Sequence, residues 1–299
     1  QAQVESIGCC IAVQNDAIAP ADGLLYAIRD VTNTIDSVPL ITASIISKKA
    51  AEGLGSLVLD VKCGTAAFMQ TLEDAKALAE SMVGAATGLG INTVAQITQM
   101  DYPIGQFVGN SLEVLGSILV LQGKGSTDTM ELVVLQCAEL IMRAGVANSH
   151  KQAENMIAKV IADGSALEKF KQMCTQQGVE EATALALIES PTSVLPSSKY
   201  VTTIRTTQPG YVGEIHSMVL AEIARKHGAG RFTMEDKIVP EIGFEICVER
   251  GQFVESEFIW LKFHHNQPLT EEESAALSNS LIISQQKFEP KSRLITIVE

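Results

Sequence analysis

Apolar and polar positions along the first half of the chain predict an ordered series of helices and strands. The apolar run at residues 7–13 has the length of a buried strand, and residues 14–23 carry the Asn, Asp, Pro and Gly of a loop. A helix is expected over residues 37–52, because Pro39 suits a first helical turn and Gly53 suits a helix end.

A strand, a helix and a second strand follow. Residues 56–61 are typical of a strand that is buried on both faces of a parallel sheet. Residues 71–87 have apolar positions at helical spacing, with Thr71 as the expected cap and acidic residues in the first turn. Residues 92–98 are expected to form the second strand. This order is a βαβ unit and predicts an α/β fold with a large, mixed or mainly parallel sheet.

The second half of the chain changes from helices to strands. Helices are expected over residues 109–121, 128–145, 150–162 and 165–177. Residues 190–198 contain two prolines and four serines, as a linker does. Residues 199–264 hold strands and a single helix near 216–227, and a last helix is expected over 270–286. These residues predict a C-terminal α+β module that begins near residue 196.

Composition limits the classes of partner. The chain has 22 Lys and Arg against 35 Asp and Glu, a formal net charge of −13, which argues against nucleic acid or an anionic membrane as the main partner. Neither a membrane-spanning apolar stretch nor a signal peptide is apparent. The six cysteines are scattered without C-x-x-C spacing, as expected of reduced residues in a cytoplasmic protein.

Several local motifs are better explained by structure than by chemistry. Gly88-Leu89-Gly90 ends a helix and lacks the third glycine of a dinucleotide-binding turn. Residues 123–127 suggest a turn between helices more than a phosphate loop, and 226–231 suggest a helix end, with an anion site as the alternative. The five histidines lack metal-ligand spacing, and surface or capping positions are expected for them.

One helix carries a more specific pattern. Ile41, Ser44 and Lys48 share a helical face, which presents an apolar contact, a hydroxyl and a cation in a row. A ligand site would explain this set. A lysine that reaches solvent from a helix end is the alternative.

The same residues belong to a longer pattern that resembles the thymidine and pyrimidine-nucleoside phosphorylases. The matching stretches, which cover essentially the whole chain, are residues 26–32, 36–49, 59–69, 109–114 and 228–231. The resemblance implies a pentosyltransferase that cleaves a pyrimidine nucleoside with inorganic phosphate, giving the free base and a sugar 1-phosphate. It implies a small helical domain beside a large α/β domain, no cofactor, and a homodimer in the full-length protein.

The resemblance also assigns the base-binding residues. Arg29, Ser44 and Lys48 match the trio that contacts the polar edge of the pyrimidine, and Arg29 and Lys48 are the expected catalytic residues. Ile41 and Phe68 match positions that line the base pocket. The assignment suits the chemistry, because the departing pyrimidine becomes negative and a guanidinium and an ammonium stabilise that charge in the transition state.

The family's phosphate site, with its Lys-His-Ser motif, has no match in this chain. We therefore expect no phosphate-binding residues here, and we expect a C-terminal piece of a phosphorylase. Its ranges would be 1–12 and 55–195 for the α/β domain, 13–54 for the rest of the helical domain, and 196–299 for the C-terminal module. No metal is expected, because Gly116 stands where some family members have an acidic cation ligand.

The sequence is consistent with three functions. The first is thymidine phosphorolysis by the intact protein, with this chain supplying the base-binding half of the site. A broader enzyme that accepts uridine and thymidine is the second. The third is a truncated pyrimidine-binding protein without catalytic activity.

Overall fold

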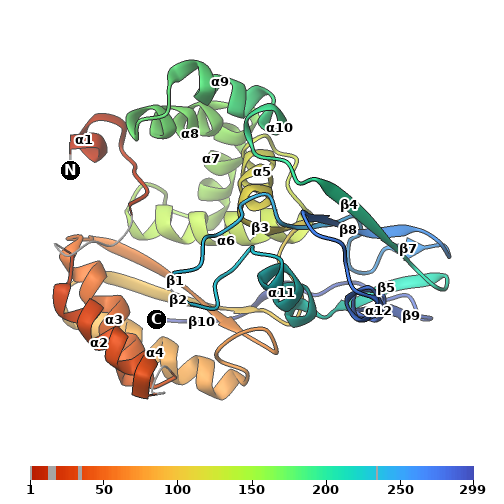
Figure 1. Ribbon diagram of the computed structural model, residues 1–299. Coiled ribbons are helices and arrows are strands. Elements are labelled where there is room, and N and C mark those ends of the chain that lie inside the picture. The colour runs from red at the N-terminus through yellow and green to blue at the C-terminus, as the bar shows by residue number, and fades with distance from the viewer. Residues whose placement is uncertain (1, 13–17, 33–35, 234) are drawn as a thin grey trace. The chain divides into compact units, whose positions relative to one another are not determined.

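The computed structural model describes residues 2–12, 18–32, 36–233 and 235–299 (Figure 1). By its internal contacts the chain divides into two compact units, each built from separate stretches of sequence. Unit 1 comprises Gln1–Cys9, Asp101–Met130 and Lys159–Ser292, and unit 2 comprises Cys10–Met100, Glu131–Ala158 and Arg293–Glu299.

The helices and strands are named in chain order. The helices are α1 (Ala2–Ile7), α2 (Pro20–Thr32), α3 (Val38–Ala51), α4 (Leu72–Gly88), α5 (Asn110–Leu121), α6 (Thr127–Arg143), α7 (His150–Ala162), α8 (Ser165–Gln176), α9 (Glu181–Glu189), α10 (Pro191–Val194), α11 (Ser217–Lys226) and α12 (Glu271–Asn279). The strands are β1 (Ser56–Cys63), β2 (Asn92–Gln99), β3 (Phe107–Gly109), β4 (Tyr200–Arg205), β5 (Gly210–Ile215), β6 (Gly243–Ile246), β7 (Phe253–Val254), β8 (Ile259–His265), β9 (Leu281–Ser284) and β10 (Leu294–Val298).

Unit 2 is built on the expected strand, helix and strand. β1 and β2 pair in parallel through the α4 crossover, and β10 adds to the other edge of β2 in the antiparallel direction. The hydroxyl of Thr71 accepts a hydrogen bond from the backbone N–H of Asp74 at 3.2 Å, so the expected cap of α4 is present. The sheet is therefore mixed, with a parallel pair at its centre, and the α/β prediction is confirmed.

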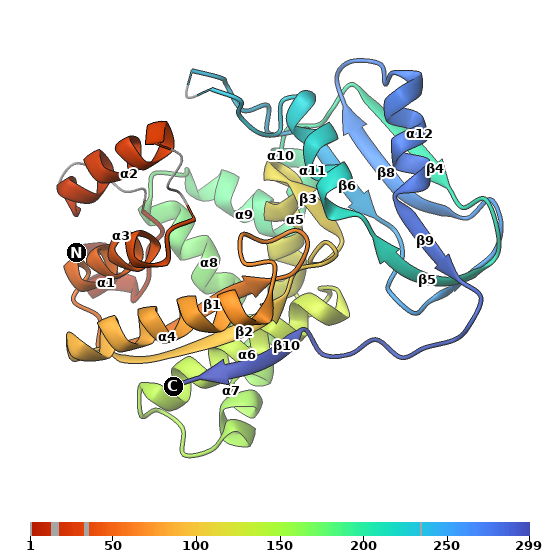
Figure 2. The same ribbon diagram turned by 90° about the horizontal axis from the view of Figure 1, so that it is seen from below.

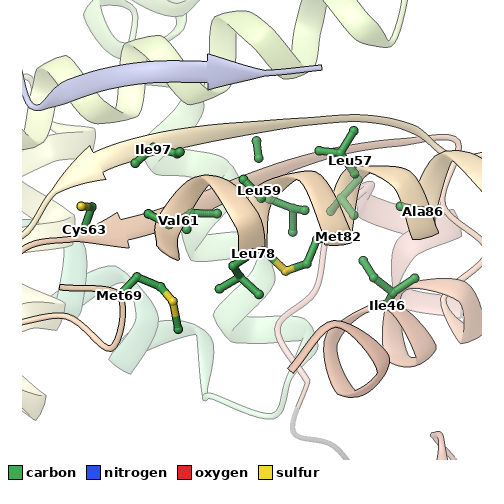
Figure 3. Close-up of a cluster of buried hydrophobic side chains, with 14 of the residues drawn as sticks. Ile46, Leu57, Leu59, Val61, Cys63, Met69, Leu78, Met82, Ala86 and Ile97 are labelled. Atoms are coloured by element: carbon green, nitrogen blue, oxygen red, sulfur yellow. The ribbon is translucent and has the colours of Figure 1, made fainter. Parts of the chain in front are cut away.

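One face of this sheet carries the hydrophobic core of unit 2. Alternate side chains of β1 pack against the buried face of α4, and Ile46 of α3 extends the same cluster (Figure 3). The strand residues in the cluster are Leu57, Leu59, Val61, Cys63, Ala95 and Ile97. The opposite face carries polar side chains such as Asp60, whose carboxylate accepts a hydrogen bond from Gln136 of α6 at 2.6 Å. Burial of the apolar face fixes the register of β1 and leaves Asp60 on the other side.

The strands and helices of unit 1 are arranged as two antiparallel sheets and the helices that pack on them. β3, β6, β8 and β4 form one sheet in that order (Figure 2), and β7, β5 and β9 form the other. The core includes Trp260, Phe244 and Phe263 from the strands, Leu220 from α11 and Leu277 from α12, all of them fully buried. The prediction of an α+β module in the C-terminal part is confirmed.

Three segments differ from the prediction. Residues 2–7 form helix α1, and residues 8–12 have no regular structure, so the strand expected at 7–13 is wrong as far as the described residues show. Helix α2 begins at Pro20, inside the expected loop 14–23, of which residues 14–17 lie outside the described part. The expected linker 190–198 contains the short helix α10.

The end of the chain was also predicted incompletely. The helix expected over 270–286 ends at Asn279, and strand β9 follows it. Residues 293–299 fall within the expected range of the C-terminal module; by packing they belong to unit 2, where residues 294–298 pair with β2. The three-range division of the chain into family domains stays a prediction, because the compact units group residues by packing alone.

Candidate active site

The candidate site is built on the neighbouring helices α2 and α3 of unit 2. Lys48 lies in the last turn of α3, and Asp22 lies in the first turn of α2. The Lys48 Nζ atom donates to Asp22 Oδ2 at 2.6 Å. Each charge sits at the helix end that its sign favours, since a helix N-terminus attracts anions and a C-terminus attracts cations.

Ser44 joins the same cluster from one turn earlier on α3. Lys48 Nζ donates to Ser44 Oγ at 2.9 Å, across the four-residue spacing that puts both side chains on one face of α3. Ser44 is buried, whereas the Lys48 side chain keeps 25% of its surface exposed and the Asp22 side chain only 9%. The arrangement therefore presents a partly exposed lysine side chain whose ammonium is held by residues of two helices.

Helix α3 is covered on more than one side, which explains how polar residues come to be buried on it. Thr42 Oγ1 and Ser81 Oγ of α4 are 2.8 Å apart, so this side of α3 faces α4. Ile41 is half-buried and packs against the hydrophobic core of unit 2. Ser44 and Lys48 contact each other, and Lys48 contacts Asp22 of α2. A role for Ile41 as a wall of the base pocket stays a prediction.

The other two predicted base-binding residues are placed less completely. Arg29 belongs to α2, but its side chain lies outside the described part of the chain. Phe68 lies in the loop after β1 with 77% of its surface exposed. That loop is held by backbone hydrogen bonds, among them Gly64 N–H to Met69 O at 3.1 Å and Ala66 N–H to Met100 O at 3.0 Å. Phe68 is thus an apolar side chain on a fixed loop, and the pyrimidine contact of both residues stays a prediction.

Asp22 is the residue of this cluster that sequence reasoning missed. It stands in Pro20-Ala21-Asp22-Gly23, a composition that resembles a loop. The available signal was Pro20 followed two positions later by an acid, a pattern typical of the first turn of a helix.

Motifs outside the cluster behave mostly as structural elements. Residues 226–231 follow the end of α11, where Gly228 has the positive φ of +110° that a helix end requires, so the structural interpretation is confirmed. His264 and His265 lie on opposite faces of β8, as expected from the alternation of a strand.

The prediction that all five histidines have surface or capping positions is wrong for His265. Its ring is buried, and its nitrogens lie 2.8 Å from Thr202 Oγ1 and 2.6 Å from Gln267 O. The stacked ring of Phe263, 5.0 Å away between centroids, shows that this histidine belongs to the core of unit 1.

No group of three or more metal-binding side chains is arranged for a metal ion within the part of the chain that the structure describes. Among the same residues, no helix is both long enough and apolar enough to span a bilayer. No disulfide joins any two of the six cysteines in the described chain.

Comparison with known proteins places these residues in a family. Residues 1–167, which contain the whole candidate site, match the model of the glycosyl transferase family a/b domain. Residues 211–284 match the pyrimidine nucleoside phosphorylase C-terminal domain.

Individual relatives align over almost the whole chain. Thymidine phosphorylase of Rattus norvegicus is 40% identical over 94% of this chain and 60% of its own length. Thymidine phosphorylase of Homo sapiens is 38% identical over 95% of this chain and 60% of its own length. Pyrimidine-nucleoside phosphorylase of Staphylococcus haemolyticus is 38% identical over 93% of this chain and 63% of its own length. The chain thus spans about three fifths of the length of these relatives, and it belongs to the thymidine and pyrimidine-nucleoside phosphorylase family, with the family's glycosyl transferase a/b domain.

Proposed function

We propose that this chain supplies the pyrimidine-binding half of a thymidine phosphorylase. The observation that carries the proposal is the contact of the Lys48 ammonium with buried Ser44 and Asp22, in a chain of the phosphorylase family. The reaction is the reversible phosphorolysis of thymidine to thymine and 2-deoxyribose 1-phosphate. Inorganic phosphate is the co-substrate, and the residues that bind it lie outside the set proposed here.

The chemistry assigned to Lys48 follows from its charge. When the glycosidic bond breaks, its electron pair moves onto the pyrimidine, and phosphate forms the new bond to the sugar carbon. An ammonium beside the base stabilises this negative charge more than it stabilises the neutral nucleoside, so it lowers the barrier. Arg29 is proposed to act in the same way through its planar guanidinium, and the Ser44 hydroxyl to orient the base edge.

The test compares Lys48→Ala with Lys49→Ala in the full-length protein that carries this chain. Lys49 is the matched control, because it is the next residue of α3 and pairs with Glu52 at 2.9 Å on the exposed side. Loss of Lys48 is expected to lower kcat/KM for thymidine by about 100-fold or more, the scale of removing one group that stabilises a developing anion. The Lys49 variant is expected to keep its activity. Phosphate-dependent release of thymine is read from its absorbance at alkaline pH.

Near-normal turnover by Lys48→Ala would overturn the proposal. If the full-length protein binds thymine and releases none from thymidine, the non-catalytic pyrimidine-binding alternative takes its place. Equal kcat/KM values for uridine and thymidine favour the broader pyrimidine-nucleoside phosphorylase. The Staphylococcus haemolyticus relative is named for that activity.

We further propose a homodimeric, cytoplasmic enzyme. The scattered spacing of the six cysteines, without a C-x-x-C pair, supports a reducing compartment. Sedimentation of the full-length protein tests the oligomeric state, and a monomer at micromolar concentration would contradict it.

A further inference from the structure

Asp22 is outside the set of expected base-binding residues, yet its contact to Lys48 is shorter than that of Ser44, at 2.6 Å against 2.9 Å. We infer that Asp22 is a positioning residue for Lys48: its carboxylate fixes the ammonium so that a remaining N–H donor serves the bound pyrimidine. The inference rests on the proposed function, because it concerns the same site.

The first argument is a count of donors. A lysine ammonium has three N–H donors and no acceptor. Among the described residues, Asp22 Oδ2 and Ser44 Oγ accept two of them, and one remains for a ligand. Two fixed contacts restrict the rotation of the ammonium, so the direction of the third donor is set before a ligand arrives.

The second argument is the fixed position of Asp22 itself. Its side chain is nine-tenths buried, and its backbone N–H donates to Ala19 O at 2.9 Å in the first turn of α2. A charge pair in such surroundings is attracted more strongly than a pair in water. Lys49 and Glu52 form the contrasting pair, because both of their side chains are at least one third exposed.

A purely structural ion pair that ties α2 to α3 is the competing explanation. It predicts that loss of Asp22 lowers stability and leaves the turnover of the folded enzyme unchanged. A positioning residue predicts that kcat falls in the fraction that is folded. The Lys48→Ala variant provides a second test. If Asp22 acts through Lys48, loss of Asp22 lowers turnover when Lys48 is present and has little further effect on turnover when Lys48 is absent.

The kinetic experiment uses the full-length protein with Asp22→Asn, Lys48→Ala and the double variant. Asp22→Asn is expected to lower kcat for thymidine about 10- to 100-fold, the cost of misplacing a reacting group by about 1 Å, with the KM for phosphate unchanged. Adding Asp22→Asn to Lys48→Ala is expected to cost less than about twofold more, because the two residues act as one unit. Glu52→Gln is the control and is expected to leave kcat unchanged.

Asp22→Glu keeps the carboxylate and is expected to recover part of the lost kcat, which also provides a folded variant if Asp22→Asn does not fold. A direct measurement on the full-length protein is the nitrogen-15 NMR signal of the Lys48 ammonium, which hydrogen bonding protects from exchange with water. Asp22→Asn is expected to broaden or shift this signal, and Glu52→Gln is expected to leave it in place.

The outcomes separate the two proposals. An active Lys48→Ala variant overturns the proposed function. An inactive Lys48→Ala variant beside a folded Asp22→Asn variant with normal kcat overturns the positioning role alone. The positioning role is also overturned if the losses of kcat in the two single variants multiply in the double variant. It is overturned as well if the Lys48 ammonium signal responds to neither Asp22→Asn nor Asp22→Glu.

Discussion

His265 is a single residue whose protonation is tied to the core of unit 1. Its Nδ1 lies 2.6 Å from the carbonyl oxygen of Gln267, which only accepts, so Nδ1 carries the proton and Nε2 accepts from the Thr202 hydroxyl at 2.8 Å. Burial lowers the pKa of His265 below its usual 6.5, and the nearby rings of His227 and His264 add to the effect, while the Gln267 carbonyl opposes it. Folding therefore favours the neutral form of the ring.

This environment predicts a loss of stability in mild acid. The unfolded chain takes up the His265 proton near pH 6.5 and the folded chain only at lower pH, so this contribution is full above 6.5 and is lost as pH falls below it. Between about pH 7.5 and about pH 5.5, the free energy of unfolding should fall more in the wild type than in His265→Asn. Urea unfolding followed by Trp260 fluorescence measures the free energy of unfolding at each pH. His150→Gln, at an exposed histidine, is the control, and an equal pH dependence in His265→Asn would contradict the prediction.

Residue spacing predicted part of the candidate site and could not predict the rest. Ser44 and Lys48 are four positions apart on one helix, so local geometry alone brings them together. Asp22 reaches Lys48 from another helix across 26 positions, and nothing in the spacing encodes that contact. His265 was misjudged for a similar reason, because its burial depends on which face of β8 meets the core.

At the scale of elements, the pairing of β6 with β8 places a charge pair on one face of a sheet. Glu245 Oε1 lies 2.8 Å from Lys262 Nζ, and Oε2 lies 3.8 Å from His264 Nε2. The His264 ring, together with the Lys262 ammonium, lowers the pKa of Glu245 from 4.5 to about 2 although partial burial opposes the shift. The charged carboxylate thus contributes to the stability of this strand pair.

The expected pH dependence of this pair has the same direction as that of His265 and lies at lower pH. A carboxylate with a lowered pKa stabilises the fold above its unfolded pKa, near 4.5, and the contribution is lost as pH falls toward about 2. The stability difference between wild type and Glu245→Gln should therefore be largest near neutral pH and shrink progressively below about pH 4.5. Urea unfolding at matched ionic strength measures it. A constant difference down to about pH 2.5 would show that the effect of the substitution is not electrostatic.

Elements with a long periodic pattern were predictable, and short ones were not. Helix α4 and its flanking strands combine a cap, amphipathic spacing and apolar strands, so several independent signals agree. The apolar run at 7–13 offered only its composition, which does not separate a short strand from an irregular segment. Strand β10 has five residues and depends on a partner almost two hundred positions earlier.

At the scale of the whole molecule, both units are assembled from separate stretches of sequence. Residues 293–299 complete unit 2, where the fully buried Arg293 donates through Nη1 to Gln99 O at 3.1 Å. Its backbone carbonyl accepts from the Gln99 N–H at 2.8 Å, next to the β10 pairing. A composition change along the chain marks where helices give way to strands. It carries no information on which distant strand closes a sheet.

This assembly predicts that removal of residues 293–299 destabilises unit 2 selectively. The deletion exposes the edge of β2 and removes Arg293, so amide hydrogen exchange in β2 and β1 should accelerate. Trp260 is the only tryptophan and lies fully buried in unit 1, so its fluorescence follows that unit. The unfolding midpoint that Trp260 fluorescence reports is expected to change little.

Leu220→Ala is the reciprocal control, because truncation of this fully buried side chain of unit 1 should cost about 2–5 kcal/mol in the Trp260 transition and leave exchange in β2 unchanged. If the deletion lowers the Trp260 midpoint as much as Leu220→Ala does, the two units unfold as one, and the selective prediction is wrong.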